Sequence, residues 1–303
     1  MKITLIGCGA MGKLWLAALA QQGHDVQGWL RIAQPEIYID VNEPDDRYFR
    51  GLLPCNSINH LTHSELVIVC LKAWQVSDAL LPLLHQIPEV CPILLLHNGM
   101  GTLDELGPLK HPFLAGVTTH AAWQNNDQVF HVANGITEIG AVNSLAEPYY
   151  PIADLLHKAL PDVAWYNQIL ATCWRKLAVN CVINPLTVLY DCKNGELMAH
   201  QVHIEKLITE INQVISMEGF HADKEQLADY IYSIIHSTAN NYSSMLQDVR
   251  NKRRTEIDYI TGYLIKQARM HGLDTPENDR IYHLIKYQEE KNDGFSVNMH
   301  RQW

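Results

Sequence analysis

Three polar side chains recur at every fourth residue in an otherwise apolar stretch of the chain, WRKLAVNCVINPLTVLY at residues 174–190. They are Lys176, Asn180 and Asn184. On an α-helix this spacing places one ammonium group and two carboxamides along a single face. Burying such groups without partners costs roughly 2–7 kcal/mol for an amide and more for a charge. This stripe therefore needs either partners from neighbouring loops, as in an ordinary core helix, or a polar ligand.

The chemistry that suits this stripe is the reduction of a carbonyl group. Hydride delivery to a ketone develops negative charge on the oxygen, so an enzyme needs a proton donor and fixed dipoles beside it. Lys176 can supply the proton, and the amides of Asn180 and Asn184 can supply the dipoles. No histidine in the second half of the chain has a context that competes with Lys176 for the role of acid. Such a reaction requires a hydride donor.

The glycines near the N-terminus predict the site for that donor. Residues Gly7, Cys8, Gly9, Ala10, Met11 and Gly12 fit the pattern G-x-G-x-x-G, after the apolar run KITLIG and before a helical pattern. In such a loop the first glycine permits a tight turn, the second admits a pyrophosphate, and the third lets helix and strand pack closely. The helix N-terminus then faces the phosphates. A glycine triplet alone can be a simple loop, but the strand–turn–helix context predicts dinucleotide binding.

Two cations favour NADPH over NADH. The second predicted strand ends in Arg31, where NAD sites usually carry an acidic residue for the ribose hydroxyl, and a guanidinium suits a 2′-phosphate. Lys72 ends the strand at 65–72 and can reach the same phosphate or the pyrophosphate. The alternative for both is a solvated surface charge. Asn98, after the strand ILLLH, can contact a ligand or cap the following helix, or do both.

The pattern of the chain changes near residue 168. Before it, apolar runs alternate with helix-like segments, and after it only helical periodicity remains. We therefore predict an α/β fold: an N-terminal, doubly wound, Rossmann-type domain at 1–167 and an all-helical C-terminal domain at 168–303, with a cleft between them. The tail after about 290 is predicted to be poorly ordered. The predicted strands are 2–7, 24–31, 65–72, 93–99 and 113–119, and a short hairpin within 128–142 completes the sheet.

Composition excludes several classes of protein. The 303 residues carry a formal charge of −10, which argues against nucleic acid as a partner. Apolar runs are far shorter than the ~20 residues that span a bilayer, so we expect no membrane partner. Seven cysteines without a C-x-x-C pair fit reduced thiols in the cytoplasm. No histidine grouping suggests a metal, and the choice between monomer and homodimer stays open.

Several further segments make the chain similar to a known family. GCGAMG, LKAWQ, HNGMG, THAA, WRKLAVNCVINPLT, NGEL, SSMLQD and RRTEIDYITG together resemble ketopantoate reductase (2-dehydropantoate 2-reductase), from residue 1 to about 290. The resemblance implies NADPH-dependent reduction of 2-dehydropantoate (ketopantoate) to (R)-pantoate, a step in pantothenate and coenzyme A biosynthesis. The segment 33–64 and the C-terminal tail match no pattern of that family, and neither carries a motif residue.

The resemblance also implies a role for individual residues. Lys176 would be the general acid, Asn98 would support the carbonyl and touch the nicotinamide, and Asn180 and Asn184 would hold the hydroxyl end of the substrate. Ser244 would bind the carboxylate of the substrate, and Asn194 would make a further contact to the substrate. Glu256 would bind hydroxyl groups of the cofactor, and Ala122 would contact the cofactor through its backbone. Judged without the resemblance, Ser243 and Ser244 read as helix caps, and Glu256 as a carboxylate favoured by a helix start.

Two other functions are compatible with these features. One is a reductase of the same fold acting on a different 2-oxo acid, because the shape of the pocket sets the substrate. The other is a non-catalytic NADPH sensor, which would not require the lysine and the two asparagines to share a helix face with an anion-binding serine nearby. Ketol-acid reductoisomerase needs a metal held by carboxylates, and no such cluster occurs in the second half of the chain.

Overall fold

The computed structural model describes residues 1–44, 47–220 and 223–297, with side chains up to residue 291. The chain divides into two compact units. Unit 1 comprises Met1–His97 and Thr102–Cys173, and unit 2 comprises Asn98–Gly101 and Trp174–Trp303. The division thus falls inside one long helix rather than at residue 167, and a four-residue segment of the N-terminal half belongs to unit 2.

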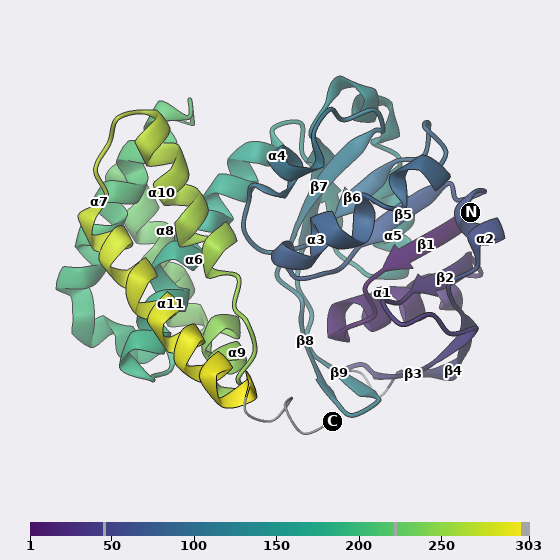
Figure 1. Ribbon diagram of the computed structural model, residues 1–303, viewed down its shortest axis with the longest axis horizontal. Helices are drawn as coiled ribbons and strands as arrows, with labels where there is room; N and C mark the ends of the chain where they lie inside the picture. Colours follow the sequence, from purple (N-terminus) through teal and green to yellow (C-terminus); the bar gives the residue numbers. More distant parts are fainter. Residues whose placement is uncertain (45–46, 221–222, 298–303) are drawn as a thin grey trace. The chain divides into compact units, whose positions relative to one another are not determined.

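Unit 1 is built on a seven-stranded sheet of order β11-β10-β7-β6-β5-β1-β2 (Figure 1). Neighbouring strands from β2 to β7 are parallel, whereas β10 runs antiparallel to β7. The strands are β1 (Lys2–Ile6), β2 (Asp25–Trp29), β5 (Leu66–Val69), β6 (Ile93–Leu95), β7 (Phe113–Thr118), β10 (Thr137–Ala141) and β11 (Val163–Trp165). The predicted α/β, doubly wound architecture is confirmed.

Both faces of this sheet are covered, which explains why its central strands are continuously apolar. In β5, Leu66 and Ile68 pack in one cluster with α1 (Ala10–Gln21), and Val67 and Val69 pack in another with α3 (Ala73–Leu80). The other helices of this unit are short: α2 (Ile58–Leu61), α4 (Thr102–Leu106) and α5 (Ile152–Ala159).

A second, four-stranded sheet has the order β4-β3-β9-β8. Its strands are β3 (Glu36–Asn42), β4 (Tyr48–Pro54), β8 (Ala121–Asn125) and β9 (Gln128–Ala133). Two of them occupy the segment 33–64, which the sequence did not assign. The predicted hairpin within 128–142 is wrong, because β9 pairs with β3 and β8 while β10 pairs with β7 and β11. Periodicity identifies a strand but not its partner, so the change of sheet between these two strands left no local signal.

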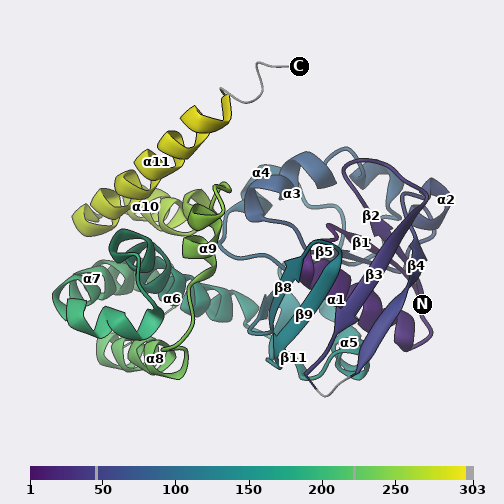
Figure 2. The same ribbon diagram turned by 90° about the horizontal axis from the view of Figure 1, so that it is seen from below.

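The helix α1 lies between the two sheets. It contacts β1 and β2 of the large sheet and β3, β8 and β9 of the small one, and Figure 2 shows it behind β3 and β9. Residues from Gly12 to Leu19 are buried without interruption. A surface helix would show an apolar stripe and a polar face. The burial of α1, which includes even Lys13, therefore follows from its being covered on two sides.

Unit 2 is all-helical, as predicted, and its core is one apolar cluster contributed by every long helix (Figure 1). In this unit Ile257 lies in a 3₁₀ turn and Leu264 lies in α10, with a break between them at Ile260. The helices are α6 (Ile169–Tyr190), α7 (Gln201–Met217), α8 (Lys224–Ser237), α9 (Ser244–Arg250), α10 (Thr261–Met270) and α11 (Pro276–Val297), with 3₁₀ turns at Asn194–His200 and Ile257–Tyr259.

The last helix, α11, has 22 residues. It continues past residue 290 to Val297, where regular structure was not predicted, because backbone hydrogen bonds can extend a helix without an apolar face. The rest of the predicted poorly ordered tail, residues 298–303, lies outside the described residues. Of the helices within the described ranges, none combines the length and the apolar character needed to cross a bilayer.

Candidate active site

The glycine loop of unit 1 has the geometry of a phosphate cradle. Gly7 has φ of +95°, and a Cβ atom there would lie 2.8 Å from the carbonyl oxygen of Cys70. A Cβ atom at Gly12 would lie 1.9 Å from the carbonyl oxygen of Gly7, so only glycine allows α1 to approach the loop this closely. At Gly9 a Cβ atom would meet nothing within 4 Å, which leaves open space beside the backbone. These three environments fit the roles that a dinucleotide pyrophosphate requires.

The start of α1 adds to this fit. The helix begins at Ala10, and its N-cap residue Gly9 has no side chain that could accept a bond from the first turn, in which Met11 also lies. Its exposed N–H groups carry the partial positive charge that favours phosphate. Between the glycines, burial raises the pKa of the Cys8 thiol to about 12, so this side chain is neutral at physiological pH. The loop therefore presents donors and no negative charge of its own.

The two predicted cofactor cations belong to the same edge of the large sheet. The strands β5, β1 and β2 are parallel neighbours, so the residues that follow them meet at their common carboxyl edge. Arg31 follows β2 and is exposed, and Lys72 follows β5 and is half-buried at the start of α3. The backbone N–H of Lys72 donates to the side chain of Gln75 at 3.2 Å. The glycine loop, Arg31 and Lys72 are thus grouped as the topology predicts.

Ala122, the other predicted cofactor contact in unit 1, lies on β8 opposite His131 of β9. Beside it, the Nδ1 atom of His120 lies 3.0 Å from Nε2 of His131 and accepts from the backbone N–H of Gly135 at 3.1 Å. Burial, and secondly the neighbouring imidazole, lower the pKa of His120 to about 4, so it is neutral at physiological pH. The sequence analysis missed this pair, which links the start of β8 to β9 and to the turn after it.

In unit 2, the polar stripe lies on α6 as its spacing predicts. Asn180 and Asn184 are 7% and 6% exposed, and Lys176 is half-buried. The Nδ2 atom of Asn180 is buried and has no hydrogen-bond partner among the described residues. In an ordinary core helix, neighbouring loops would satisfy such an amide. The stripe therefore has the character of a surface built for a polar ligand.

Two further candidate residues are placed by turns. Asn194 begins a 3₁₀ turn, and its Nδ2 donates to Oγ1 of Thr238 at 2.9 Å, whereas its buried Oδ1 lacks a partner within the part of the chain that the structure describes. Ser243 is the N-cap of α9 and accepts from the N–H of Leu246 at 3.1 Å. Ser244 is the first residue of that helix and is exposed. The capping role therefore belongs to Ser243, and the hydroxyl of Ser244 is accessible.

Asn98 and Glu256 meet within unit 2. Nδ2 of Asn98 lies 3.4 Å from Oε2 of Glu256, although 158 residues separate them in the chain. Glu256 is 4% exposed, and the backbone N–H of Met100 donates to the carbonyl of Tyr259 at 2.8 Å. The segment 98–101 is thus tied to the segment 256–259. Sequence reasoning singled out both residues but had no means of pairing them.

Comparison with known proteins agrees with these features. The model of the ketopantoate reductase PanE/ApbA family matches residues 3–144, and its C-terminal counterpart matches residues 168–289. A 2-dehydropantoate 2-reductase of Yersinia pestis is 52% identical over the whole length of both chains. The chain belongs to the ketopantoate reductase family.

Solved structures show the same fold. The probable 2-dehydropantoate 2-reductase of Bacillus subtilis is 28% identical, covering 95% of this chain and all of its own, with a TM-score of 0.80. The ternary structure of D-mandelate dehydrogenase with NADH and anilino(oxo)acetate is 25% identical, covering 97% of this chain and all of its own, with a TM-score of 0.86. Chains of this fold thus bear the names of different enzymes, a 2-dehydropantoate 2-reductase and a D-mandelate dehydrogenase, so the fold by itself does not identify the substrate.

Proposed function

We propose that this protein reduces 2-dehydropantoate (ketopantoate) to (R)-pantoate with NADPH, in the biosynthesis of pantothenate and coenzyme A. The observation that carries the proposal is the polar stripe on α6, in which the buried Nδ2 atom of Asn180 lacks a protein partner among the described residues. The substrate has a carboxylate at one end and a hydroxyl group at the other, and amides and a serine hydroxyl can bind both. The full-length similarity to 2-dehydropantoate 2-reductases supports this choice of substrate.

In this reaction the residues of unit 2 bind the substrate and supply the proton. The ammonium group of Lys176 donates a proton to the C2 oxygen, becomes a neutral amine, and recovers a proton from water, which its half-buried position allows. Asn98 supports the carbonyl, Asn180 and Asn184 bind the hydroxyl end, and Ser244 binds the carboxylate. Asn194 adds a further amide contact from its turn.

The cofactor contacts follow from the fit of the glycine loop. The backbone of residues 7–12 would hold the pyrophosphate, Arg31 would hold the 2′-phosphate, and Lys72 would hold either the same phosphate or the pyrophosphate. Ala122 would offer its backbone to the cofactor, and Glu256 would bind cofactor hydroxyls. NADPH, when bound, supplies the hydride. We also infer a cytoplasmic location, which the seven free thiols support because structural disulfides are rare in that compartment.

The central test is the oxidation of NADPH in the presence of different 2-oxo acids. We expect a strong preference for ketopantoate over 2-oxoisovalerate and pyruvate, with little oxidation in the absence of substrate. Equal rates with all three acids would indicate a general 2-oxo acid reductase. NADPH binding without any oxidation would indicate a sensor and contradict the proposal.

Cofactor choice has its own test in Arg31→Ala. Losing a charge-assisted bond to a 2′-phosphate removes about 1.5–3 kcal/mol, so the Kd for NADPH should rise roughly 10- to 150-fold while that for NADH hardly changes. Fluorescence titration with each nucleotide measures both constants. Arg50→Ala is the matched control, since Arg50 is also an exposed arginine of unit 1 but pairs with Asp40 in the small sheet. Equal losses for both nucleotides at Arg31 would contradict its contact with the phosphate.

A further inference from the structure

A chain of buried hydroxyl groups joins the two helices that carry candidate substrate residues at opposite ends of the ligand. Oγ1 of Thr187 on α6 lies 2.6 Å from Oγ of Ser243, the N-cap of α9. Thr187 is fully buried, and Ser243 is 6% exposed. Asn184 lies one turn before Thr187, and Ser244 directly follows Ser243. The link therefore runs between the helix turns that hold the hydroxyl-binding amide and the carboxylate-binding serine.

The direction of every bond in this chain is determined by the groups at its ends. The N–H of Leu246 donates to Oγ of Ser243 at 3.1 Å, and the hydroxyl of Thr187 donates to the carbonyl of Asn184 at 2.8 Å. Because a carbonyl can only accept, the proton of Thr187 is engaged there. The proton of Ser243 must then be donated to Thr187. Each hydroxyl is thus both donor and acceptor, which couples the backbone of α6 at Asn184 to the first turn of α9.

The coupling acts at a point where α6 lacks one of its own backbone hydrogen bonds. Pro185 lies inside the helix directly after Asn184, and proline removes one backbone hydrogen bond of the helical ladder. The missing bond is the one from residue 185 to the carbonyl of Cys181, so the turn that contains Asn184 has one backbone hydrogen bond fewer than a regular turn. Two other threonine and serine hydroxyls of unit 2 bond within their own helix: Thr209 donates to Glu205 and Ser216 to Asn212, each within α7.

We infer that Thr187 and Ser243 are positioning residues that set the separation between Asn184 and Ser244, and thereby the selectivity for a 2-oxo acid that carries both a carboxylate and a distal hydroxyl group. The inference rests on the proposed function, in which Asn184 and Ser244 bind those two groups. Neither Thr187 nor Ser243 needs to touch the substrate. Their effect is to keep the two binding groups at the distance that ketopantoate spans.

The test is Thr187→Val, which keeps the shape of the side chain and removes the hydroxyl. We expect the KM for ketopantoate to rise about tenfold with kcat nearly unchanged, because a buried donor loses its acceptor and the ground-state and transition-state contacts weaken together. The preference for ketopantoate over 2-oxoisovalerate should fall by a similar factor, since only ketopantoate uses both ends. The Kd for NADPH should stay at the wild-type value.

Two controls separate this effect from a general loss of structure. Thr187→Ser retains the hydroxyl and should restore the KM and the selectivity. Thr209→Val removes a half-buried helical hydroxyl of the same unit that bonds within α7, and should leave both quantities within about twofold. If Thr187→Val is not recovered as folded protein, Ser243→Gly breaks the same link at little cost to the cap and should lower the selectivity equally.

The outcomes distinguish this inference from the proposed function. A wild-type protein without preference for ketopantoate would overturn the proposed function and the inference with it. A wild-type preference that survives unchanged in both Thr187→Val and Ser243→Gly would overturn the inference alone. A loss of selectivity in these variants, reversed in Thr187→Ser and absent in Thr209→Val, would support it.

Discussion

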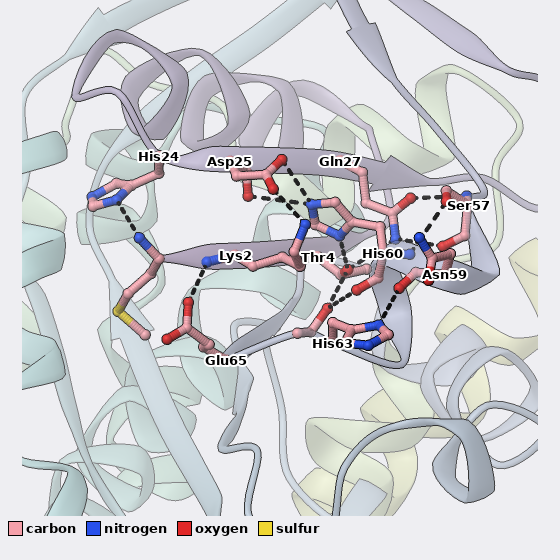
Figure 3. A network of polar contacts seen from close by, with 12 residues as sticks. Lys2, Thr4, His24, Asp25, Gln27, Ser57, Asn59, His60, His63 and Glu65 are labelled. Atoms are coloured by element: carbon pink, nitrogen blue, oxygen red, sulfur yellow. Dashed lines mark hydrogen bonds and ion pairs between the residues drawn. The ribbon is translucent and has the colours of Figure 1, made fainter.

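Two polar regions of the molecule, one in each unit, differ in how their buried groups are satisfied. In unit 1, an amino-edge network surrounds the start of β1 and β2 (Figure 3), formed by Lys2, Thr4, Asp25, Gln27, Ser57, His60 and Ser64. A single atom, Oγ1 of Thr4, makes three of these contacts: to His60 at 3.2 Å, to Ser64 at 2.7 Å and to Gln27 at 3.0 Å. The polar groups here bond to one another and hold α2 against the sheet.

In the stripe on α6, by contrast, one buried polar atom has no such partner among the described residues. Nδ2 of Asn180 and Oδ1 of Asn194, both candidate ligand contacts, are buried without a partner among the residues described. Unpartnered atoms also occur in unit 2 at isolated positions such as Asn212. The stripe differs because a lysine and two amides share one helix face. Buried polar groups that satisfy one another indicate a structural role, whereas a buried amide nitrogen without a partner, here that of Asn180, calls for a ligand.

Replacing the lysine of each region should give the largest contrast. Lys176→Ala should lower kcat about 10²- to 10⁴-fold, the usual range for a lost general acid, with little change in the Kd for NADPH. Lys2→Ala removes a partly exposed ion pair with Asp25 and should cost less than about 1 kcal/mol of stability, with kcat unchanged. Steady-state kinetics and urea unfolding measure both effects. A Lys176→Ala variant with wild-type kcat would show that Lys176 is not the general acid.

Replacing an amide in each region should separate function from stability. Asn180→Leu removes an amide whose Nδ2 has no partner in the described structure, so the free energy of unfolding should be unchanged or higher while kcat/KM for ketopantoate falls about tenfold or more. Gln27→Leu breaks bonds to Thr4 and to both backbone groups of Ser57, and should lower the free energy of unfolding by about 1–3 kcal/mol. If Asn180→Leu instead destabilises the fold as Gln27→Leu does, the amide is structural and the comparison fails.

The smallest expected effect is the response of the amino-edge network to acid. Burial lowers the pKa of His60 below its ordinary value of 6.5, although the carboxylate of Asp25 opposes this shift. The unfolded chain therefore binds the proton at higher pH than the folded one, so this contribution to stability is complete above pH 6.5 and is lost as the pH falls below it. Urea unfolding at a series of pH values measures the slope.

His60→Gln should reduce that slope without abolishing it. His120 remains in the variant, and its pKa of about 4 produces a loss of stability in the same direction between pH 6.5 and 4. The kinetic constants for ketopantoate should be the same in His60→Gln as in the wild type, because His60 belongs to the amino-edge network and not to the stripe. An unaltered slope in His60→Gln would show that the network does not exclude the charged imidazole.

Local patterns determined a large part of this protein. The glycine loop, the apolar strands β1, β2, β5, β6 and β7, and the helix with the stripe follow from sterics and periodicity within a few residues. Each is encoded where it occurs, so the sequence predicted the α/β and helical halves, the glycine loop and the stripe. Ser244, Asn194, Glu256 and Ala122 became candidates only through the resemblance to the family. The segment 33–64 was missed in part because its strand β4 lies at the edge of a second sheet and half of its residues are exposed, which weakens the apolar signal.

Only the tertiary structure decided how distant segments pair. It placed β9 in the small sheet and β10 in the large one, joined Asn98 to Glu256 across 158 residues, and linked Thr187 to Ser243. Such contacts depend on the entropy of closing the loops between the segments and on the packing of whole helices and strands. These free energies are sums over many residues, so no periodic pattern in the sequence reveals them. The residue types of the stripe are therefore local information. That an amide of this stripe lacks a partner is a property of the folded chain.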